Sequence, residues 1–159
     1  MDAARNRGIT ILAHGEPGYP ERLTDLEDPP SVVFTLGNRN LFNNPAVAIV
    51  GTREATLYGL RITAKLASGA AAAGVTVVSG LARGVDAEAH RNALPHAGGT
   101  MAVLGTGADV PYPALHHALH RRIESGGLIV SEALPGARAH PGSFPRRNRL
   151  IAADRKSVV

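Results

Sequence analysis

Short apolar runs alternate with longer segments of helical spacing along residues 46–153. The short runs are rich in β-branched residues and carry no charge, which is typical of strands buried on both faces of a parallel sheet. They are Ala46–Val50, Val75–Val78, Thr100–Leu104 and Leu128–Val130. The segments between them predict helices at Thr56–Ala73, Val85–Ala97 and Ala114–Glu124, and the start of another at Arg146–Ala153.

Strands and helices that alternate in units of about 30 residues indicate right-handed crossovers between parallel strands. The predicted fold class is therefore α/β, a Rossmann-like, doubly wound and mostly parallel sheet. Within the second predicted helix, Pro95 should cause fraying or a kink near Leu94. The first predicted helix carries apolar residues on one stripe, the arrangement that normally faces a core. They are Tyr58, Ile62, Leu66, Ala70 and Ala73.

The first 45 residues read differently, because prolines and glycines interrupt them. The pattern predicts, in order, an edge strand, a turn, one helical turn, a second strand and a second turn at Ile9–Ala13, Glu16–Pro20, Glu21–Leu26, Val32–Leu36 and Gly37–Asn40. We interpret residues 1–45 as an accessory section ahead of the main sheet, whose ordinary role is packing and edge protection. Residues 46–153 then form the Rossmann-like domain.

Each predicted strand ends in small or hydroxylated residues, namely Gly51-Thr52, Ser79-Gly80, Gly105-Thr106 and Ser131-Glu132. In open α/β sheets ligands bind at the carboxyl ends of the strands, where helix N-termini present N–H groups to anions. Tight turns explain each glycine singly, but several small residues at one sheet edge favour a crevice that a ligand can enter. The stretch Val75–His90 thus predicts a strand, a turn and a helix that bind something phosphorylated.

Composition excludes few functional classes of protein. The chain has 159 residues and a formal net charge of +4, an excess that suits an anionic polymer but is shared by many enzymes. It has no cysteine, which excludes disulfides and thiolate sites. No apolar run reaches the ~20 residues that a membrane-spanning helix needs, and no signal peptide is visible. We therefore expect a cytoplasmic protein with no membrane association.

The basic residues suggest which anion binds. The loop after Ser79 matches neither Walker A nor a complete G-x-G-x-x-G motif. Arginines stand instead after the strands, at Arg53, Arg83, Arg146, Arg147 and Arg149. Guanidinium groups pair with phosphate in bidentate fashion, so converging arginines suit a phosphodiester backbone, although a solvated basic face would also account for each of them. Phe144 could stack on a base, as aromatic residues do in proteins that bind single strands.

Two histidine patterns invite other interpretations. His116, His117 and His120 include an i, i+4 pair that could hold a metal, but no third ligand is evident, which favours a solvated helix face. Asp86 and His90 have the same spacing and could indicate acid–base chemistry. We favour a structural Asp86 in the first helical turn, where it suits the helix dipole and tethers the Arg83 loop.

The succession of motifs resembles the DprA/Smf family of DNA-processing proteins over about residues 9–153. The motifs that carry this resemblance are Tyr19-Pro20, Asp28-Pro29-Pro30, Ala48–Arg53, Tyr58-Gly59, Ser79–Asp86, Ala89-His90, Leu104–Gly107, Tyr112-Pro113, Ser131-Glu132 and Phe144–Arg149. The resemblance implies an extended Rossmann fold that binds single-stranded DNA in a basic pocket at the strand ends. It also implies a homodimer that loads the RecA recombinase during natural transformation, with no catalysis and no cofactor.

The resemblance assigns the DNA-binding pocket to Gly51, Arg53, Ser79, Gly80, Arg83, Phe144, Arg147, Asn148 and Arg149. Two departures accompany it. Family members usually begin with a small helical domain, and they continue beyond Ala152 with further strands and helices. Residues 154–159 do not follow the family pattern. We therefore expect a C-terminally truncated fragment with an incomplete sheet and a non-native tail at residues 154–159.

The competing class is an enzyme, a nucleotide-processing hydrolase of the lysine-decarboxylase-like phosphoribohydrolase type. Those enzymes carry a Pro-Gly-Gly-x-Gly-Thr loop and a paired Glu, whereas this chain has only Gly98-Gly99-Thr100, at the entry to a strand. The absence of that loop favours DNA binding. A scaffold that only recruits a recombinase remains a third possibility.

Overall fold

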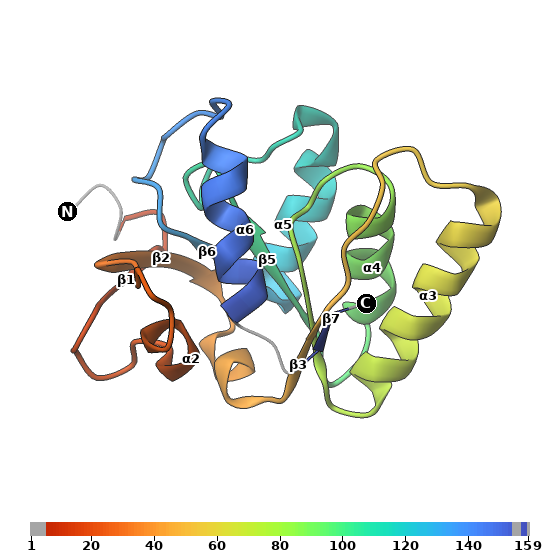
Figure 1. Cartoon of the computed structure of the whole chain (residues 1–159), viewed down its shortest axis with the longest axis horizontal. Helices are drawn as coiled ribbons and strands as arrows, with labels where there is room; N and C mark the ends of the chain where they lie inside the picture. The colour runs from red at the N-terminus through yellow and green to blue at the C-terminus, as the bar shows by residue number, and fades with distance from the viewer. Residues whose placement is uncertain (1–5, 154–156, 159) are drawn as a thin grey trace.

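The computed structural model describes residues 6–153 and 157–158 (Figure 1). The strands are β1 (Thr10–Ala13), β2 (Val32–Gly37), β3 (Ala46–Ala48), β4 (Thr76–Ser79), β5 (Thr100–Leu104), β6 (Leu128–Ser131) and β7 (Ser157–Val158). The α-helices are α2 (Glu21–Thr24), α3 (Leu57–Ala72), α4 (Val85–Ala93), α5 (His117–Gly126) and α6 (Ser143–Ala153). Two 3₁₀ helices, η1 (Arg39–Asn43) and η2 (Ala114–His116), complete the described elements.

In the described part of the chain the strands form one seven-stranded sheet, in the order β1-β2-β6-β5-β4-β3-β7. The strands from β6 to β7 in this order run parallel to one another, while β1 and β2 are antiparallel to their neighbours. The predicted α/β class and mostly parallel sheet are confirmed. The carboxyl ends of β3, β4, β5 and β6 consequently meet at one edge of the sheet.

The interpretation of residues 1–45 as a section ahead of the main sheet is wrong. β2 pairs with β6 from Phe34 opposite Ser131 to Gly37 opposite Leu128, so it continues the same sheet. Residues 33–36 are all buried, which shows that β2 is covered on both faces like the parallel strands. β1 is the outer strand, as predicted. The prolines between the two strands shape their connection and do not separate a domain.

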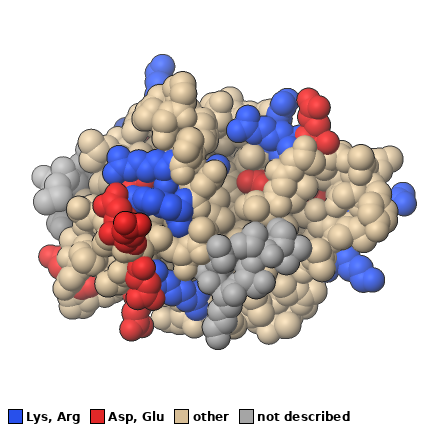
Figure 2. Space-filling model, in the orientation of Figure 1, with Lys and Arg blue, Asp and Glu red and all other residues tan. Residues whose placement is uncertain are grey.

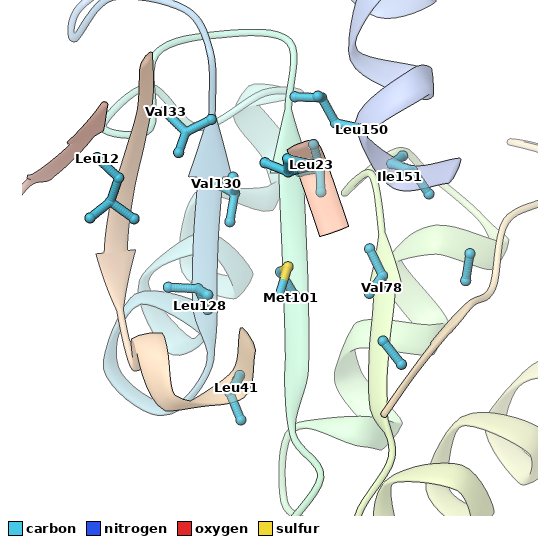
Figure 3. Packing of buried hydrophobic residues seen from close by; sticks show 13 residues of the cluster. Leu12, Leu23, Val33, Leu41, Val78, Met101, Leu128, Val130, Leu150 and Ile151 are labelled. Carbon is cyan, nitrogen blue, oxygen red and sulfur yellow. The ribbon is translucent and has the colours of Figure 1, made fainter. Parts of the chain in front are cut away.

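Helices cover both faces of the sheet. On one face, α6 and α2 pack on the strands, and Leu150 and Ile151 of α6 lie over Val78, Met101 and Val130 (Figure 3). On the other face, α4 and α5 bury Ala87, Leu119 and Ile123 against β5 and β6. A third cluster joins α3 to α4 and β4 through small side chains, Ala67, Ala71, Ala89 and Ala93. Consecutive valines of β4, Val77 and Val78, therefore face different helix layers.

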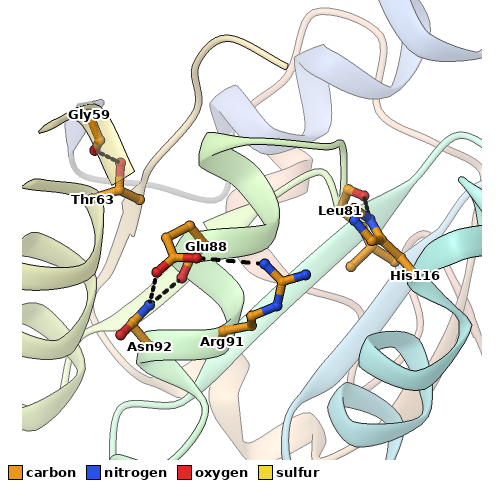
Figure 4. Close-up of polar contacts among 7 residues, drawn as sticks. All are labelled: Gly59, Thr63, Leu81, Glu88, Arg91, Asn92 and His116. Atoms are coloured by element: carbon orange, nitrogen blue, oxygen red, sulfur yellow. Dashed lines mark hydrogen bonds and ion pairs between the residues drawn. The ribbon is translucent and has the colours of Figure 1, made fainter. Parts of the chain in front are cut away.

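Most of the predicted buried stripe of α3 is exposed instead, although its member Ala70 packs against the third core cluster. Tyr58, Ile62 and Leu66 are 74%, 40% and 43% exposed, and the buried residues are Thr63, Ala67 and Ala71. The hydroxyl of Thr63 donates to the carbonyl of Gly59 within the helix (2.8 Å; Figure 4). Because α3 packs closely on the alanines of α4, only small side chains fit on its inner face. The larger apolar residues are left on the outer face.

Several boundaries differ by a few residues from those predicted. α4 ends at Ala93 with Leu94 as its C-cap, which confirms the effect expected of Pro95. β3 stops at Ala48, and α6 begins three residues earlier than predicted, at Ser143. The expected turn at Gly37–Asn40 leads into η1. The hypothesis of a non-native tail concerns residues 154–159, and all of these except 157 and 158 lie outside the described residues. Residues 157 and 158 form β7, whose backbone pairs with β3.

The inverted face of α3 gives a stability test. Ala67→Leu should destabilise the protein by about 1–3 kcal/mol because it forces extra volume into a packed contact. Leu66→Ala should cost less than about 1 kcal/mol because that side chain is 43% exposed. Urea unfolding of both variants measures the two effects. A larger loss for Leu66→Ala than for Ala67→Leu would show that the stripe predicted from the sequence is the buried one.

Candidate functional site

A crevice lies at the carboxyl ends of the parallel strands, between the loops after β3 and β4 and the length of α6 from Phe144 to Ala152. It consists of two adjacent hollows. The first, of about 270 Å³, is lined by Arg53, Gly80, Ala82, Arg83, Tyr112, Pro113, Leu115, Phe144 and Arg147. The second, of about 400 Å³, is lined by Ala48, Val50, Gly51, Arg53, Ala82, Asp86, Arg147, Asn148, Ile151 and Ala152. Arg53, Ala82 and Arg147 belong to both hollows, which we call together the crevice.

Most residues that the sequence singled out meet in this crevice. They are Gly51, Arg53, Gly80, Arg83, Phe144, Arg147 and Asn148. A larger hollow of about 600 Å³ lies elsewhere, beside residues 18–22 and 39–43. It contains none of the predicted site residues and none of the strand ends, so volume alone does not identify the site.

Ser79 and Arg149 lie outside the crevice. Ser79 is fully buried, and its hydroxyl donates to the carbonyl of Ile49 (2.7 Å), which ties β4 to the segment after β3. Arg149 pairs with Glu132 (NH2 to Oε2, 2.8 Å), and Arg146 contacts the other oxygen of the same carboxylate (3.2 Å). Arg149 lines a different hollow, next to residues 28–32. The structure therefore gives both residues internal contacts.

Arg147 connects α6 to two strands of the sheet. Its side chain is buried, and its NH1 nitrogen donates to the carbonyls of Gly80 (2.8 Å) and Val103 (2.9 Å). Its Nε donates to the side-chain oxygen of Asn148 (3.1 Å). A Cβ at position 80 would lie 2.5 Å from NH1, so this contact requires glycine there. Burial lowers the pKa of Arg147, and the charge of Asp86 opposes that effect.

Asp86 occupies the N–H groups that the sequence suggested for an external anion. Its carboxylate accepts a hydrogen bond from the N–H of Gly80 (3.1 Å). Burial raises its pKa, while hydrogen bonds from Gly80, Gly51 and Ala82 and the charge of Arg147 act in the opposite direction. The predicted tether of the Arg83 loop is thus present. The strand-end amides stabilise this internal anion, so an external one must be bound by side chains.

The glycines at the strand ends are packed against the protein itself. A Cβ at Gly51 would lie 2.8 Å from Cγ2 of Val85. A Cβ at Gly105 would lie 3.2 Å from Ser143 and 3.3 Å from the ring of Phe144. The interpretation that these small residues leave room for a ligand is therefore corrected. They let α4 and α6 approach the strand ends.

The exposed cations of the crevice are Arg53 and Arg83. Among the described residues neither forms an ion pair, whereas Arg146 and Arg149 share Glu132. The charge of Arg53 contributes to the lowered pKa of Arg147, because the two positively charged guanidinium groups repel each other. In Figure 2, the Lys and Arg side chains on the coloured part of the visible face lie in small separate groups, and some of these groups lie beside Asp or Glu. Positive charge at the site is therefore local.

Aromatic rings form one wall of the first hollow. Tyr112 and Phe144 lie with ring centroids 5.2 Å apart at an interplanar angle of 36°, and Tyr112 is 45% exposed. The guanidinium carbon of Arg147 lies 5.8 Å from the centroid of Phe144, a cation–π contact that fixes the ring. In the sequence, Tyr112-Pro113 stood out only as one of the motifs that carry the family resemblance. Only the fold shows that Tyr112 meets Phe144, which is 32 positions away in the sequence.

The histidines of α5 and its entry are not on a solvated face. His116 and His120 are both 3% exposed, and each forms a hydrogen bond with a backbone carbonyl, that of Leu81 or Ala108 (2.9 Å each). Only His117 is exposed, as predicted. Within the described residues no cluster of three or more histidine or carboxylate side chains could hold a metal. The expected solvated pair is corrected to two buried histidines that secure loops.

His90 is completely buried and neutral. Its Nε2 accepts from the N–H of Leu81 (3.2 Å), and its Nδ1 lies 2.7 Å from the hydroxyl of Thr100. That hydroxyl donates to the carbonyl of Val77 (2.8 Å), so Nδ1 must carry the proton and donate to Thr100. Burial lowers the pKa of His90 from 6.5 to about 3, and the charges of His116, Arg147 and Arg91 add to this. Both ring nitrogens are engaged in structural hydrogen bonds.

A doubly wound sheet with a crevice at the carboxyl ends of its parallel strands places the chain among the Rossmann-like ligand-binding proteins. Comparison with known proteins gives the family. The family model described as DNA recombination-mediator protein A matches residues 10–159, so the chain belongs to that family.

The relatives of the chain are the DprA and Smf proteins. The chain is 41% identical to protein Smf of Synechocystis over its whole length, and 39% identical over 89% of its length to DNA processing protein DprA of Streptococcus pneumoniae. It spans 41% and 50% of the length of these two proteins. No helix in the described part of the chain is long and apolar enough to cross a membrane.

Solved structures of the family have the same fold. DNA processing protein A of Helicobacter pylori, studied for its single-stranded DNA binding mode, matches with a TM-score of 0.86 and 36% identity, covering 94% of this chain and 67% of the other. DprA of S. pneumoniae matches with a TM-score of 0.87 and 36% identity, covering 99% of this chain and 56% of the other.

The buried His90 predicts acid sensitivity. Its pKa is lower in the folded protein (about 3) than the ordinary value of 6.5, so the stability it contributes is present above pH 6.5. That stability is lost as the pH falls from 6.5 towards 3, by on the order of a few kcal/mol. His90→Gln should be less stable than the parent at pH 7.5 but should lose less stability on acidification.

Urea unfolding of both proteins between pH 7.5 and 4 measures this difference. The raised pKa of Asp86 acts in the opposite direction, because protonation of that carboxyl favours the folded state. Both proteins contain Asp86, so its contribution cancels in the comparison. Parallel loss of stability in the two proteins would contradict the role given to His90.

Proposed function

We propose that the chain binds single-stranded DNA in the crevice, without catalysis and without a cofactor. The observation that carries this proposal is the pairing of two exposed cations, Arg53 and Arg83, with the aromatic wall formed by Tyr112 and Phe144 in one hollow. Proteins that bind single strands without sequence preference combine cations for the phosphates with rings on which bases stack. The study of single-stranded DNA binding by the H. pylori relative supports the same ligand.

A single strand suits this crevice better than a duplex. The rings of Tyr112 and Phe144 can stack only on bases that are free of their own neighbours, which a duplex does not offer. Arg53 and Arg83 can each contact one phosphate, so the affinity for the strand should depend moderately on salt concentration.

The finer role is a proposal that rests on family membership. The family description names a DNA recombination mediator. We propose that the whole protein works in the cytoplasm as a homodimer, and that it loads RecA onto single-stranded DNA during natural transformation. In that role the crevice holds the strand while the recombinase assembles on it. The competing hydrolase function requires a nucleotide in the same crevice, and the missing Pro-Gly-Gly-x-Gly-Thr loop disfavours it.

The function is tested by binding of a fluorescent oligothymidine across a salt series, with duplex DNA and AMP as competitors. The proposal predicts binding that weakens as salt rises, competition by unlabelled single strand and little competition by duplex. Binding of AMP in place of the strand, or its hydrolysis, would assign the crevice to the enzyme class.

Arg53→Ala should weaken binding of the oligonucleotide for every sequence alike, because it removes a phosphate contact and not a base contact. The slope of log Kd against log salt should fall by about 0.7, the value for one phosphate on a single strand. Stability should be unchanged, because Arg53 is exposed. The matched control is Arg121→Ala, which removes an exposed arginine of α5 that lines neither hollow. Equal affinity of the Arg53→Ala variant and the parent would remove Arg53 from the site.

A further inference from the structure

The loop between β4 and α4 contains a backbone conformation that needs support. Leu81 has a φ of +60°. Among the described residues, no other non-glycine residue has a positive φ. The left-handed region is unfavourable for a branched side chain, so such a conformation persists only where its surroundings hold it. Leu81 is also completely buried. It stands directly between Gly80 and the two loop residues that line the crevice, Ala82 and Arg83.

Two buried histidines hold the two polar groups of this one residue. The N–H of Leu81 donates to Nε2 of His90 (3.2 Å), and its carbonyl lies 2.9 Å from Nδ1 of His116. A carbonyl only accepts, so His116 must donate from Nδ1 (Figure 4). His90 must leave Nε2 unprotonated, which its hydrogen bond to Thr100 secures. Both peptide groups flanking the Leu81 Cα are therefore fixed.

The two histidines come from different walls of the site. His90 belongs to α4, behind the loop that carries Arg83. His116 ends η2, whose segment also supplies Tyr112, Pro113 and Leu115 to the first hollow. The hydrogen bond from His116 to Leu81 therefore ties the aromatic wall of the hollow to the Arg83 loop. Neither histidine lines the hollow, so neither would touch a ligand in it.

We propose that His90 and His116 are positioning residues of the crevice. They hold Leu81 in its left-handed conformation, and they thereby set the orientation of the Arg83 loop and its spacing from Tyr112. The inference rests on the proposed function for its effect on DNA, but the effect on the loop itself stands apart from it. Loss of the bond from His116 should let the two walls of the first hollow move relative to each other, which weakens binding without removing any contact residue.

A matched control is present on the helix that follows η2, namely α5. His120 is as buried as His116 and also forms a hydrogen bond with a backbone carbonyl, that of Ala108, at the same 2.9 Å. Ala108 lines neither hollow. His120→Ala should therefore reproduce the general cost of removing a buried histidine, while His116→Ala adds the specific effect on the crevice. In His116→Asn the side-chain amide can donate from nearly the position of Nδ1.

The experiment compares the parent with His116→Ala, His116→Asn and His120→Ala. Urea unfolding gives stability, titration with oligothymidine gives affinity under conditions where each protein is folded, and amide hydrogen exchange reports on residues 79–84. His116→Ala should bind about tenfold more weakly, the effect of about one lost hydrogen bond, and should exchange faster in this loop. His116→Asn should recover most of both properties. His120→Ala should lose stability but keep parental affinity and loop exchange.

Two outcomes overturn the inference while leaving the proposed function intact: parental affinity of folded His116→Ala, or equal weakening by His120→Ala. Failure of the parent itself to bind the strand would overturn the proposed function, and loop exchange would still test the positioning role. If His116→Ala does not fold, the parent decides the matter alone. The Leu81 amide of the parent should exchange as slowly as the amides of β4. If it exchanged as fast as an amide in an exposed loop, the positioning role of the two histidines would be refuted.

Discussion

The structure of the site depends on one buried guanidinium group. Arg147 reaches from α6 to the carbonyls of Gly80 and Val103, at the ends of β4 and β5, and this contact seats the helix on the sheet. The nearby carboxylate of Asp86 offsets the charge of Arg147 and accepts hydrogen bonds from backbone N–H groups in the loops after β3 and β4. Removing the donor of a buried carbonyl typically costs about 1–3 kcal/mol, since the carbonyl is left unsatisfied. Phe144, Asn148 and the strand-end loops all take their places from this arrangement.

This arrangement separates structural charges from binding charges. Asp86 and Arg147 offset each other below the surface, and Glu132 pairs with Arg146 and Arg149 on another side of α6. Only Arg53 and Arg83 remain at the crevice as exposed cations without an ion pair among the described residues. A net charge of +4 therefore says little about the site, because most of the local arginines are neutralised within the protein. Affinity for an anion comes from two side chains, and selectivity for a single strand comes from the rings beside them.

Local patterns predicted the elements well and their faces less well. Uninterrupted apolar runs predicted the parallel strands, and Pro95 correctly predicted the end of α4. The exposed stripe of α3 could not be predicted, because hydrophobicity does not reveal that the partner helix presents alanines and accepts only small residues. The separation of residues 1–45 failed for a similar reason. Pairing between β2 and β6 joins segments that are far apart in the sequence, and no local signal records it.

The sequence predicted which residues belong to the candidate site. The fold then showed which of them line the crevice and which are buried structural residues. Motif order placed Arg53, Arg83, Phe144 and Arg147 together, and they do meet in one hollow. It could not distinguish the buried Arg147 from the exposed Arg53, because both are arginines that follow strands. Nor could it show that His116 is buried against Leu81, since that contact joins positions 35 residues apart.

Photocrosslinking tests the central claim most directly. An oligothymidine carrying 5-bromodeoxyuridine would be irradiated in complex with the chain, and the crosslinked peptides would be identified by mass spectrometry. The account predicts crosslinks at Tyr112 and Phe144, the rings that line the first hollow, and their suppression by unlabelled single strand but not by duplex. Crosslinks confined to other surfaces, such as the exposed face of α3 with Tyr58, would place the strand elsewhere and contradict the assignment of the crevice.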